Sequence, residues 1–349
     1  MADPITANHE LLSKFCARVL ERLGLSGDDA AIAADNMVTA NLRGVDTHGV
    51  MRMSYYTAKL KAGSINTSAN LKPIKESAAT ALIDGQNGLG QVVAYRAMEV
   101  AIKKARETGV AWVSVRNSNH FGTCAHYSMM ALPNDMIGFS TTNASPKLAP
   151  TGGIDPLFGN NPWSFAVPAG EELPVVLDLA NSVVAAGRIR MAQKEGRPIP
   201  EGWALTRDGE PTTDPTQALK GILLAIGGYK GYGITLMMDF LTGVLANSAY
   251  GPRVHGVDDA ADVAGVGHSF MVLSVSSFDD VPAFKARVDS YIREIKGSRK
   301  AKGTDEIFLP GELEYRKMRQ RMKDGIPLQP KIVEDLRGYG EEFGIPFEV

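Results

Sequence analysis

TALIDGQNGLGQVVAYRAMEVAIKKARETGVAWVSV, residues 80–115, is the stretch that decides the fold class of this chain. It begins and ends with apolar runs typical of buried strands, Thr80–Asp84 and Ala111–Val115. The alanine-rich segment between them, Val92–Glu107, has the length and apolar spacing of a helix. A strand, a helix and a second strand in succession predict an α/β fold.

The segments before this unit have helical patterns. Apolar residues recur at helical spacing through residues 11–23, and Ser26 followed by Asp29 forms a capping box that predicts the start of a second helix. A third helix is expected to open just after Asp46–Gly49 and to end at Gly63, which has the position of a C-cap glycine. The N-terminal part of the chain is therefore expected to be helical.

Downstream of the unit, short strands alternate with loops. The further β-rich runs are Ile137–Thr142, Phe165–Val167, Val175–Leu177 and Ser269–Val275. Residues 143–161 are dense in Gly, Pro and Asn, which favours loops that a ligand can reach. The polar, proline-rich segment Gln193–Gln217 is typical of an exposed excursion, with a short hairpin around Asp208–Gly209. Helical periodicity returns from Pro282 onward.

With 349 residues, 44% of them hydrophobic, the chain is long enough to form two or three subdomains. We expect residues 1–70 to be a helical segment that is joined by residues 282–349. Residues 71–281 would form an α/β sheet region with an irregular excursion near 190–220.

Charge and cysteine content narrow the possible partners. The net charge of −2 is spread along the chain and provides no basic field, so we expect no nucleic acid partner. Cys16 and Cys124 are too few for a disulfide framework, which favours a reducing, cytoplasmic setting. No histidine pairs with another ligand at metal-binding spacing, so no metal is predicted. No signal for export and no apolar run long enough for a membrane span is found.

The first group with chemical potential is His48 with Arg52, four residues apart at the predicted start of the third helix. A histidine delivers a proton to a carbonyl oxygen, and an arginine holds a carboxylate through two hydrogen bonds. The alternative interpretation is that His48 caps the helix while Arg52 forms a surface ion pair. The pair alone leaves both interpretations open.

The second group is Asn119–Gly122, which follows the strand Ala111–Val115 and includes His120. The carboxyl ends of strands are where open α/β sheets bind ligands. Burial beside Phe121 would favour a neutral imidazole that accepts or relays a proton. A histidine with a purely structural role in the core is the alternative.

The third group is the glycine-rich loop Gly227–Gly233, which leads directly into Ile234–Leu241, an apolar run that predicts a buried helix. Glycines at a helix start allow backbone N–H groups to approach an anion, and Lys230 adds a positive charge there. The loop lacks the Gly-Lys-Ser/Thr ending of a Walker loop. It predicts a phosphate or carboxylate site, unless it is only a flexible turn with a solvated lysine.

A dinucleotide site of the Rossmann type is excluded. The glycines that follow the first strand, Gly85, Gly88 and Gly90, do not have the order and spacing of Gly-x-Gly-x-x-Gly. Any dinucleotide must therefore bind in another fold. The candidate positions are the loops 143–147, 159–162 and 177–180.

Taken together, these segments resemble the type 2 malate/L-lactate dehydrogenase family. That family also includes ureidoglycolate dehydrogenase, diketogulonate reductase, sulfolactate dehydrogenase and a cyclic-imine reductase. Six ordered blocks that cover nearly the whole chain carry the resemblance: Arg43–Gly49, Asn119–Gly122, Ser145–Pro150, Gly159–Pro162, Gly228–Gly233 and Leu309–Glu312. Asn160 departs from the threonine that the family usually has in Gly-Thr-Asn-Pro.

The resemblance implies an α/β homodimer that binds NAD or NADP in a non-Rossmann sheet domain, beside a helical domain built from the N- and C-terminal segments. The implied activity is the interconversion of a 2-oxo acid and a 2-hydroxy acid, at a site near the subunit interface. It implies catalytic roles for His48 and His120 and substrate binding by Arg52 and Lys147. The residues assigned to the cofactor are Ser145, Pro146, Asn161, Asp178, Leu179, Ala180, Tyr229, Lys230, Gly311 and Glu312.

Two alternatives to a 2-hydroxy acid dehydrogenase remain at this stage. One is an NAD(P)H-dependent reductase of a cyclic imine carboxylate, because the same pocket serves C=O and C=N bonds. The other is a binding protein without catalysis, which would have no need for a proton donor beside an anion clamp. The sequence does not decide between NAD and NADP, between the possible substrates, or between His48 and His120 as the residue that exchanges the proton.

Overall fold

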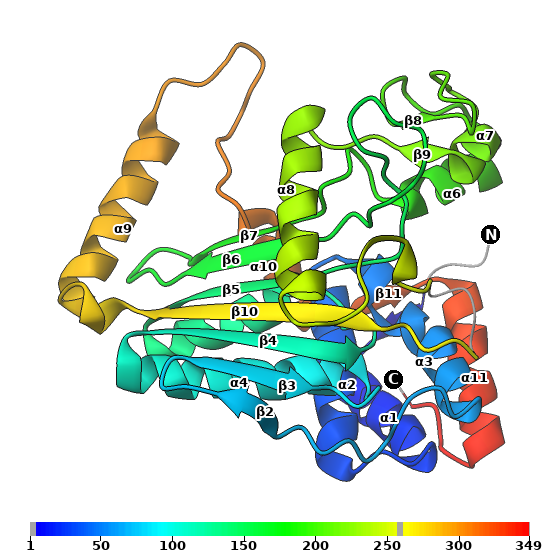
Figure 1. Ribbon diagram of the computed structural model, residues 1–349, viewed down its shortest axis with the longest axis horizontal. Helices are drawn as coiled ribbons and strands as arrows, with labels where there is room; N and C mark the ends of the chain where they lie inside the picture. Colours follow the sequence, from blue (N-terminus) through cyan, green and yellow to red (C-terminus); the bar gives the residue numbers. More distant parts are fainter. Residues whose placement is uncertain (1–4, 257–260, 349) are drawn as a thin grey trace.

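In the computed structural model, which describes residues 5–256 and 261–348, seven strands form one twisted sheet (Figure 1). Its strand order is β2-β3-β4-β10-β5-β6-β7. The strands are β2 (Pro73–Glu76), β3 (Thr80–Asp84), β4 (Val110–Ser118), β5 (Met136–Thr142), β6 (Trp163–Val167), β7 (Val175–Leu179) and β10 (Val266–Ser274). Among these described strands, β3 and β4 make the one parallel pair of the six. The fold is therefore mixed α/β.

The predicted strand–helix–strand unit is confirmed. β3 has the expected bounds, and α4 (Gly90–Thr108) connects it to the parallel strand β4. The apolar face of α4 is buried on the sheet, where Met98 and Phe270 belong to one hydrophobic cluster. Side chains alternate between the two faces of a strand, so Ser269, the residue before Phe270, points to the opposite face. There its hydroxyl donates to the Leu241 carbonyl. That face is covered by α8 (Tyr229–Asp239) and the π-helical turn Phe240–Val244.

The helical segments at the two ends of the chain share a core. It joins α1 (His9–Arg22), α2 (Gly27–Leu42) and α3 (Met53–Lys61) to α11 (Pro330–Phe343). Ser26 accepts a hydrogen bond from the Asp29 N–H, as the capping pattern predicts. At the edge of this core, β1 (Ile5–Ala7) pairs with β11 (Ile326–Leu328).

The expected third helix begins later than predicted. Asp46–His48 and Val50–Arg52 form two 3₁₀ turns, and α3 begins only at Met53. Gly49, with an extended ψ of −155°, separates the two turns. The end of α3 is as predicted, because Gly63 follows the helix with a φ of +69°.

Residues 186–223 contain more regular structure than the polar composition of that segment suggests. They form α6 (Ala186–Lys194), α7 (Pro215–Lys220) and the short ladder of β8 (Ala204–Leu205) with β9 (Ile222–Leu223). Apolar side chains such as Ile189 and Ile199 are buried in a hydrophobic cluster of this segment, which also includes Leu148. A tight turn at Thr206–Gly209 lies where the hairpin was predicted.

α9 (Val281–Gly297) projects from the body in Figure 1, and an extended segment leads from it back to α10 (Glu312–Asp324). The helix is attached to the turn between β6 and β7. Asp289 accepts hydrogen bonds from the backbone N–H groups of residues 170, 171 and 172. Within the described residues, no helix is long and apolar enough to cross a membrane.

Candidate active site

The topology of the sheet brings four of the predicted loops to one edge. β3 and β4 are parallel, β4 and β5 both run antiparallel to β10, and β5 and β7 both run antiparallel to β6. β3, β4, β5 and β7 therefore point the same way. The loops that follow them begin at Gly85, Asn119, Asn143 and Ala180, and all leave from this edge. Such an edge is where α/β sheets bind ligands.

His120 is held at this edge by the start of α4. An added Cβ at Gly90 would overlap the carbonyl oxygens of Asn119 and His120, so glycine is required for this close approach. The Asn119 side chain donates to the Gly88 carbonyl at 2.9 Å and to the Asn87 carbonyl at 3.1 Å. The backbone of His120 is thus fixed from the side of α4.

The rings of His48 and His120 lie face to face. Their centroids are 5.5 Å apart and their planes differ by 23°. Nδ1 of His120 is 2.8 Å from the hydroxyl of Tyr56, a buried residue of α3. Nδ1 of His48 is 3.0 Å from the hydroxyl of Thr47, which is exposed. The structure therefore brings together the two histidines that the sequence places 72 residues apart.

Arg52 lies beside both histidines. Its Nε donates to the Thr47 carbonyl at 2.8 Å. No carboxylate among the described residues pairs with it, so the alternative of a surface ion pair is not what the structure shows. The i,i+4 argument for placing Arg52 next to His48 was wrong in its cause, because the two residues lie in separate 3₁₀ turns. The bond to Thr47, rather than a shared helical face, brings Arg52 back toward His48.

The electrostatics of this cluster favour neutral imidazoles in the unliganded protein. Burial, followed by the charge of Arg52, lowers the pKa of His48 to about 4. Burial lowers the pKa of His120 well below its usual value, and charges on His48 and Arg52 lower it further. The burial of His120 supports the expectation of a neutral imidazole beside Phe121.

A third histidine supports the turn from behind. His268 on β10 is completely buried, with its two ring nitrogens each 2.8 Å from a hydroxyl, Thr142 and Ser118. Its ring stacks on Phe121 at 4.6 Å between centroids. Burial lowers its pKa to about 3. His268 therefore packs as a neutral ring under the residue that follows His120.

The segments assigned to a cofactor meet on the two sides of β7. On one side, the Val176 N–H donates to the Pro310 carbonyl at 3.0 Å, next to Gly311. On the other side, the Ile226 N–H donates to the Asn181 carbonyl at 2.8 Å, which places the glycine-rich loop beside the end of β7. Asp178, Leu179 and Ala180 thus lie between two contacts of this segment. One joins Val176 to the residue before Gly311, and the other joins Asn181 to the loop before Tyr229.

The start of α8 is open and positively charged. Gly227 and Gly228 have φ of +61° and +63°, and no side chain caps the helix. Tyr229 and Lys230 are exposed, and no carboxylate of the described residues pairs with Lys230. Free backbone N–H groups at a helix start beside an unpaired lysine suit an anion such as a phosphate.

Three of the residues assigned to the cofactor have side chains that are engaged inside the protein. Asp178 accepts from the Ala125 N–H at 2.8 Å, and burial raises the pKa of its carboxyl to about 6. Asn161 is completely buried, accepts from the Ala144 N–H and donates to the Thr235 carbonyl. Glu312 receives two bonds from Lys296, at 2.6 and 2.7 Å, and a further one from Arg316. Asn161 therefore orders the loop that holds Ser145 and Pro146, and Glu312 orders the turn that holds Gly311.

Lys147 remains apart from the histidine pair in the described contacts. Its backbone N–H donates to the Phe158 carbonyl at 2.7 Å and its carbonyl accepts from the Leu223 N–H at 2.9 Å. Its side chain is exposed, without a described salt-bridge partner. The loop belongs to the same sheet edge as His120, because it follows β5.

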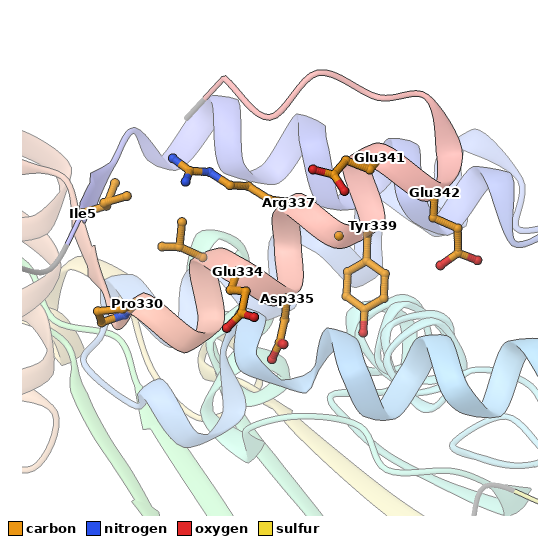
Figure 2. A pocket seen from close by; sticks show the side chains of 10 residues that line it. Ile5, Pro330, Glu334, Asp335, Arg337, Tyr339, Glu341 and Glu342 are labelled. Carbon is orange, nitrogen blue, oxygen red and sulfur yellow. The ribbon is translucent and has the colours of Figure 1, made fainter. Parts of the chain in front are cut away.

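A groove of about 780 Å³ runs along α11 and contains none of the predicted site residues. Figure 2 shows Glu334, Asp335, Glu341 and Glu342 projecting from this helix, with Arg337 as the cation among them. Four carboxylates disfavour an anionic ligand. This groove is therefore not the site that the histidines define.

Sequence reasoning assigned Tyr56 no role beside His48 and Arg52, and it missed His268. Tyr56 follows Arg52 by four residues, so extending the spacing argument by one turn would have found it. His268 comes from β10 and has no local signal, because only the fold brings it beneath the turn that holds His120.

Two neighbouring histidines beside an arginine without a described carboxylate partner have the chemistry to exchange a proton next to a carboxylate. The malate dehydrogenase of Pyrococcus horikoshii is 41% identical over 342 residues, covering 96% of this chain and 94% of that protein. An NAD(+) ureidoglycolate dehydrogenase of Escherichia coli and an NADP(+) (2R)-3-sulfolactate dehydrogenase of Chromohalobacter salexigens are each 31% identical. They cover 95% and 92% of this chain, and 94% and 93% of their own lengths.

The fold leads to the same class. The structure of sulfolactate dehydrogenase from Methanocaldococcus jannaschii superposes with a TM-score of 0.93 at 40% identity, and 98% of each chain is covered. The family model for malate/L-lactate dehydrogenase matches residues 7–337. The chain belongs to this family, whose named members here are dehydrogenases, and the resemblance found in the sequence is confirmed.

Proposed function

We propose that this protein interconverts a 2-oxo acid and the corresponding 2-hydroxy acid with NAD or NADP. The observation that carries this proposal is Arg52, a cation without a described counter-ion that is anchored through Nε beside two histidines. Its terminal nitrogens remain for a carboxylate, which binds arginine through two parallel hydrogen bonds. The carbon next to that carboxylate then lies near the imidazoles.

The residues of the chain manage the proton of this reaction. During oxidation, a neutral imidazole of the His48–His120 pair accepts the proton of the substrate hydroxyl. The lowered pKa of both histidines keeps them neutral for that role in the free enzyme. In the reduction direction, a carboxylate bound at Arg52 cancels part of the positive charge that opposes imidazole protonation. The nicotinamide, when bound, supplies the hydride acceptor or donor.

The sheet edge suits a dinucleotide outside the Rossmann fold. We assign the phosphates to the open start of α8 with Lys230, and the rest of the cofactor to Ser145–Pro146, Asp178–Ala180 and Gly311. Gly311 supports a close approach, since a Cβ there would lie 2.7 Å from the Val176 carbonyl oxygen. A sheet with one parallel pair among its described strands differs from the parallel sheet of a Rossmann domain, which supports the non-Rossmann assignment. Relatives that use NAD(+) and NADP(+) are both named above, so either cofactor is proposed.

A second copy of the chain is the proposed partner, as a homodimer. α8 and the π-helical turn expose a continuous series of large apolar side chains, with 48% of Met237, 46% of Phe240 and 59% of Leu245 accessible. Such a surface is typical of a protein–protein interface. It starts at the same helix whose first turn holds Lys230, which is consistent with a site near the subunit boundary. Sedimentation velocity tests the dimer, and a monomer at micromolar concentration contradicts it.

The domain organisation and the location of the protein are proposed from the same observations. The shared core of α1, α2, α3 and α11 supports a helical domain formed by residues 1–70 with residues 282–349, although α9 within the second range is attached to the sheet. The sheet region 71–281 would hold the cofactor. Both cysteines are buried as free thiols, which fits a cytoplasmic enzyme.

A substrate panel tests the activity directly. Purified protein is mixed with NADH or NADPH and with oxaloacetate, sulfopyruvate, pyruvate, a cyclic imine carboxylate or an oxo compound that lacks a carboxylate. We expect loss of nicotinamide absorbance with the 2-oxo acids and none without the carboxylate. Turnover of the imine alone would support the imine reductase, and cofactor binding without turnover of any compound would support a non-catalytic relative.

A further inference from the structure

The two histidines of the candidate site are attached to different hydrophobic cores. His48 lies in a 3₁₀ turn just after α2, whose Met37 belongs to the core shared by the helical segments at the two ends of the chain. His120 follows β4, and the next residue, Phe121, belongs to the core between α4 and the sheet. The 5.5 Å between the two ring centroids therefore depends on how these cores are joined.

Asn41, near the C-terminal end of α2, holds the turns around His48. Its Oδ1 accepts from the Val50 N–H at 2.8 Å, and its Nδ2 donates to the Asp46 carboxylate at 2.7 Å. Only 2% of Asn41 is accessible. A Cβ on Gly49 would overlap the Asn41 amide, so this side chain is in direct contact with the backbone of the turn. The amide thus binds residues on both sides of His48.

Asn36, earlier on the same helix, reaches the turn that holds His120. Its Nδ2 donates to the Tyr127 hydroxyl at 3.1 Å, and that hydroxyl donates to the Phe121 carbonyl. A Cβ on Gly122 would overlap Oδ1 of Asn36. The side chains of Asn36 and Tyr127 are completely buried. This second amide therefore acts on the two residues that follow His120.

Helix formation does not explain the two asparagines. Asparagine is a poorer helix former than alanine, and burying an amide costs free energy unless the amide is hydrogen-bonded. Oδ1 of Asn36 has no hydrogen-bond partner in the described part of the chain and lies against the backbone of Gly122. α2 thus has polar side chains at two buried positions, and each of them meets the backbone beside a histidine.

We propose that α2 sets the separation of His48 and His120, with Asn36 and Asn41 as positioning residues that hold the two turns from one rigid helix. A helix suits this role, because its hydrogen-bonded backbone fixes the distance between two of its side chains. The proposal rests on the proposed function only for its consequence, which is the efficiency of proton exchange with the substrate. A displacement of about 1 Å in a reacting group can lower a rate by about 10²-fold.

Crystal structures of ligand-free variants test the separation without any substrate. Tyr127→Phe removes the hydroxyl that connects Asn36 to the turn after His120. Asn41→Ala removes both bonds to the turns around His48. We expect the distance between the two ring centroids to change by about 1 Å or more in each variant. An unchanged separation in both variants overturns the proposal.

Met37→Ala is the matched control on the same helix. Met37 is completely buried in the helical core, and its side chain makes no hydrogen bond to either turn. The cavity left by the substitution should lower the free energy of unfolding while the ring separation and kcat stay unchanged. If the control moved the rings as far as the two test variants, general loosening of α2 would be the cause and the proposal would be wrong.

Kinetics of the same variants test the consequence for the reaction. Tyr127→Phe should lower kcat by about 10- to 100-fold, while the substrate KM and the cofactor Kd stay within about twofold. Asn41→Ala should lower kcat to a similar extent and also raise KM, since Arg52 belongs to the turn that begins at Val50. The double variant should be no more than about threefold slower than the slower single variant, because either loss already frees the separation. Fully multiplicative losses contradict the proposal.

Two further outcomes are distinguishable. If Tyr127→Phe or Asn41→Ala is poorly folded, Asn36→Ala replaces it, because this variant removes the amide that holds the His120 turn. Its ring separation and kcat then decide by the same criteria. A changed separation in a protein that turns over no 2-oxo acid, even without substitutions, would overturn the proposed function while leaving the role of α2 supported.

Discussion

The turn after β4 and the loop before α8 are both assigned to the proposed site, but the protein supports them in opposite ways. His120 is held by Gly90 behind its backbone, by Tyr56 at its ring and by His268 beneath Phe121. Lys230 follows glycines in an exposed loop and has no described ion-pair partner. The end of the proposed site that holds the histidines is preorganised by packing and hydrogen bonds, whereas the proposed anion-binding end is an exposed loop.

Gly90→Ala is expected to have the largest effect on activity, because it disturbs the backbone turn that holds His120. The added methyl overlaps the carbonyls of Asn119 and His120 and must push the imidazole away from the substrate. We expect kcat to fall about 10³-fold, near 4 kcal/mol in activation free energy, since displacements of this size misalign proton transfer. Gly338→Ala, where a Cβ would meet nothing within 4 Å, is the control and should keep full activity. Wild-type kcat in Gly90→Ala would show that the turn is not rigid.

Lowering the pH tests the support of the histidine turn through the free energy of unfolding. His268 has a pKa of about 3 in the folded protein against 6.5 unfolded, so its contribution is present above pH 6.5 and is lost as the pH falls toward 3. At pH 4.5 the loss should be about 3 kcal/mol in the free energy of unfolding. Urea denaturation at pH 8 and pH 4.5 measures it. His268→Gln should reduce this pH dependence, and the exposed His255→Gln should not; equal slopes in all three proteins would refute the assignment.

Arg52→Ala tests the proposed substrate-binding residue, which lies beside the histidine pair. We expect the KM for a 2-oxo acid to rise and kcat/KM to fall by about 2 kcal/mol or more, because a two-pronged carboxylate contact is lost. Cofactor affinity should stay nearly unchanged. The loss of the positive charge should also move the acidic limb of the pH profile upward, since Arg52 lowers the pKa of His48 and His120. Steady-state kinetics from pH 5 to 8 measures both effects. If neither kcat/KM nor the pH of the acidic limb changed, Arg52 would have a structural role only.

Lys230→Ala should have the smallest effect and the opposite selectivity. One exposed charge at a helix start contributes about 1 kcal/mol, so cofactor binding should weaken about fivefold while the substrate KM is unaffected. Fluorescence titration with NADH and NADPH at low salt gives the affinity. Lys147→Ala, an exposed lysine on another loop of the same edge, serves as comparison. An equal loss of cofactor affinity in both variants would indicate a general electrostatic effect of exposed lysines rather than a binding site at α8.

The contrast also explains what could be predicted from the sequence. The strand–helix–strand unit and the helix caps are local patterns, and they are present where expected. The helix after the glycine-rich loop was expected to be buried, but it begins at Tyr229, inside the loop, and 48% of Met237 is accessible. The late start of α3 was missed because a 3₁₀ turn has no apolar periodicity to reveal it. The place of His268 cannot be found from local patterns, since only the pairing of β10 with β4 and β5 brings it beneath Phe121. The core of residues 186–223 was missed because its few apolar side chains are spread among prolines and charges.

The small core of α6 and α7 has a consequence for how such an enzyme changes over generations. α6 comes close to the catalytic turn at Gly187, where a Cβ would lie 3.6 Å from the Thr47 methyl group. A loop unit with largely its own core accepts substitutions on its surface without loss of the sheet. We therefore expect substitutions in α6 to change the surroundings of Thr47 and His48 while His120 and its supports stay intact. Under the proposed function, substrate range could then change during evolution without loss of the residues that exchange the proton.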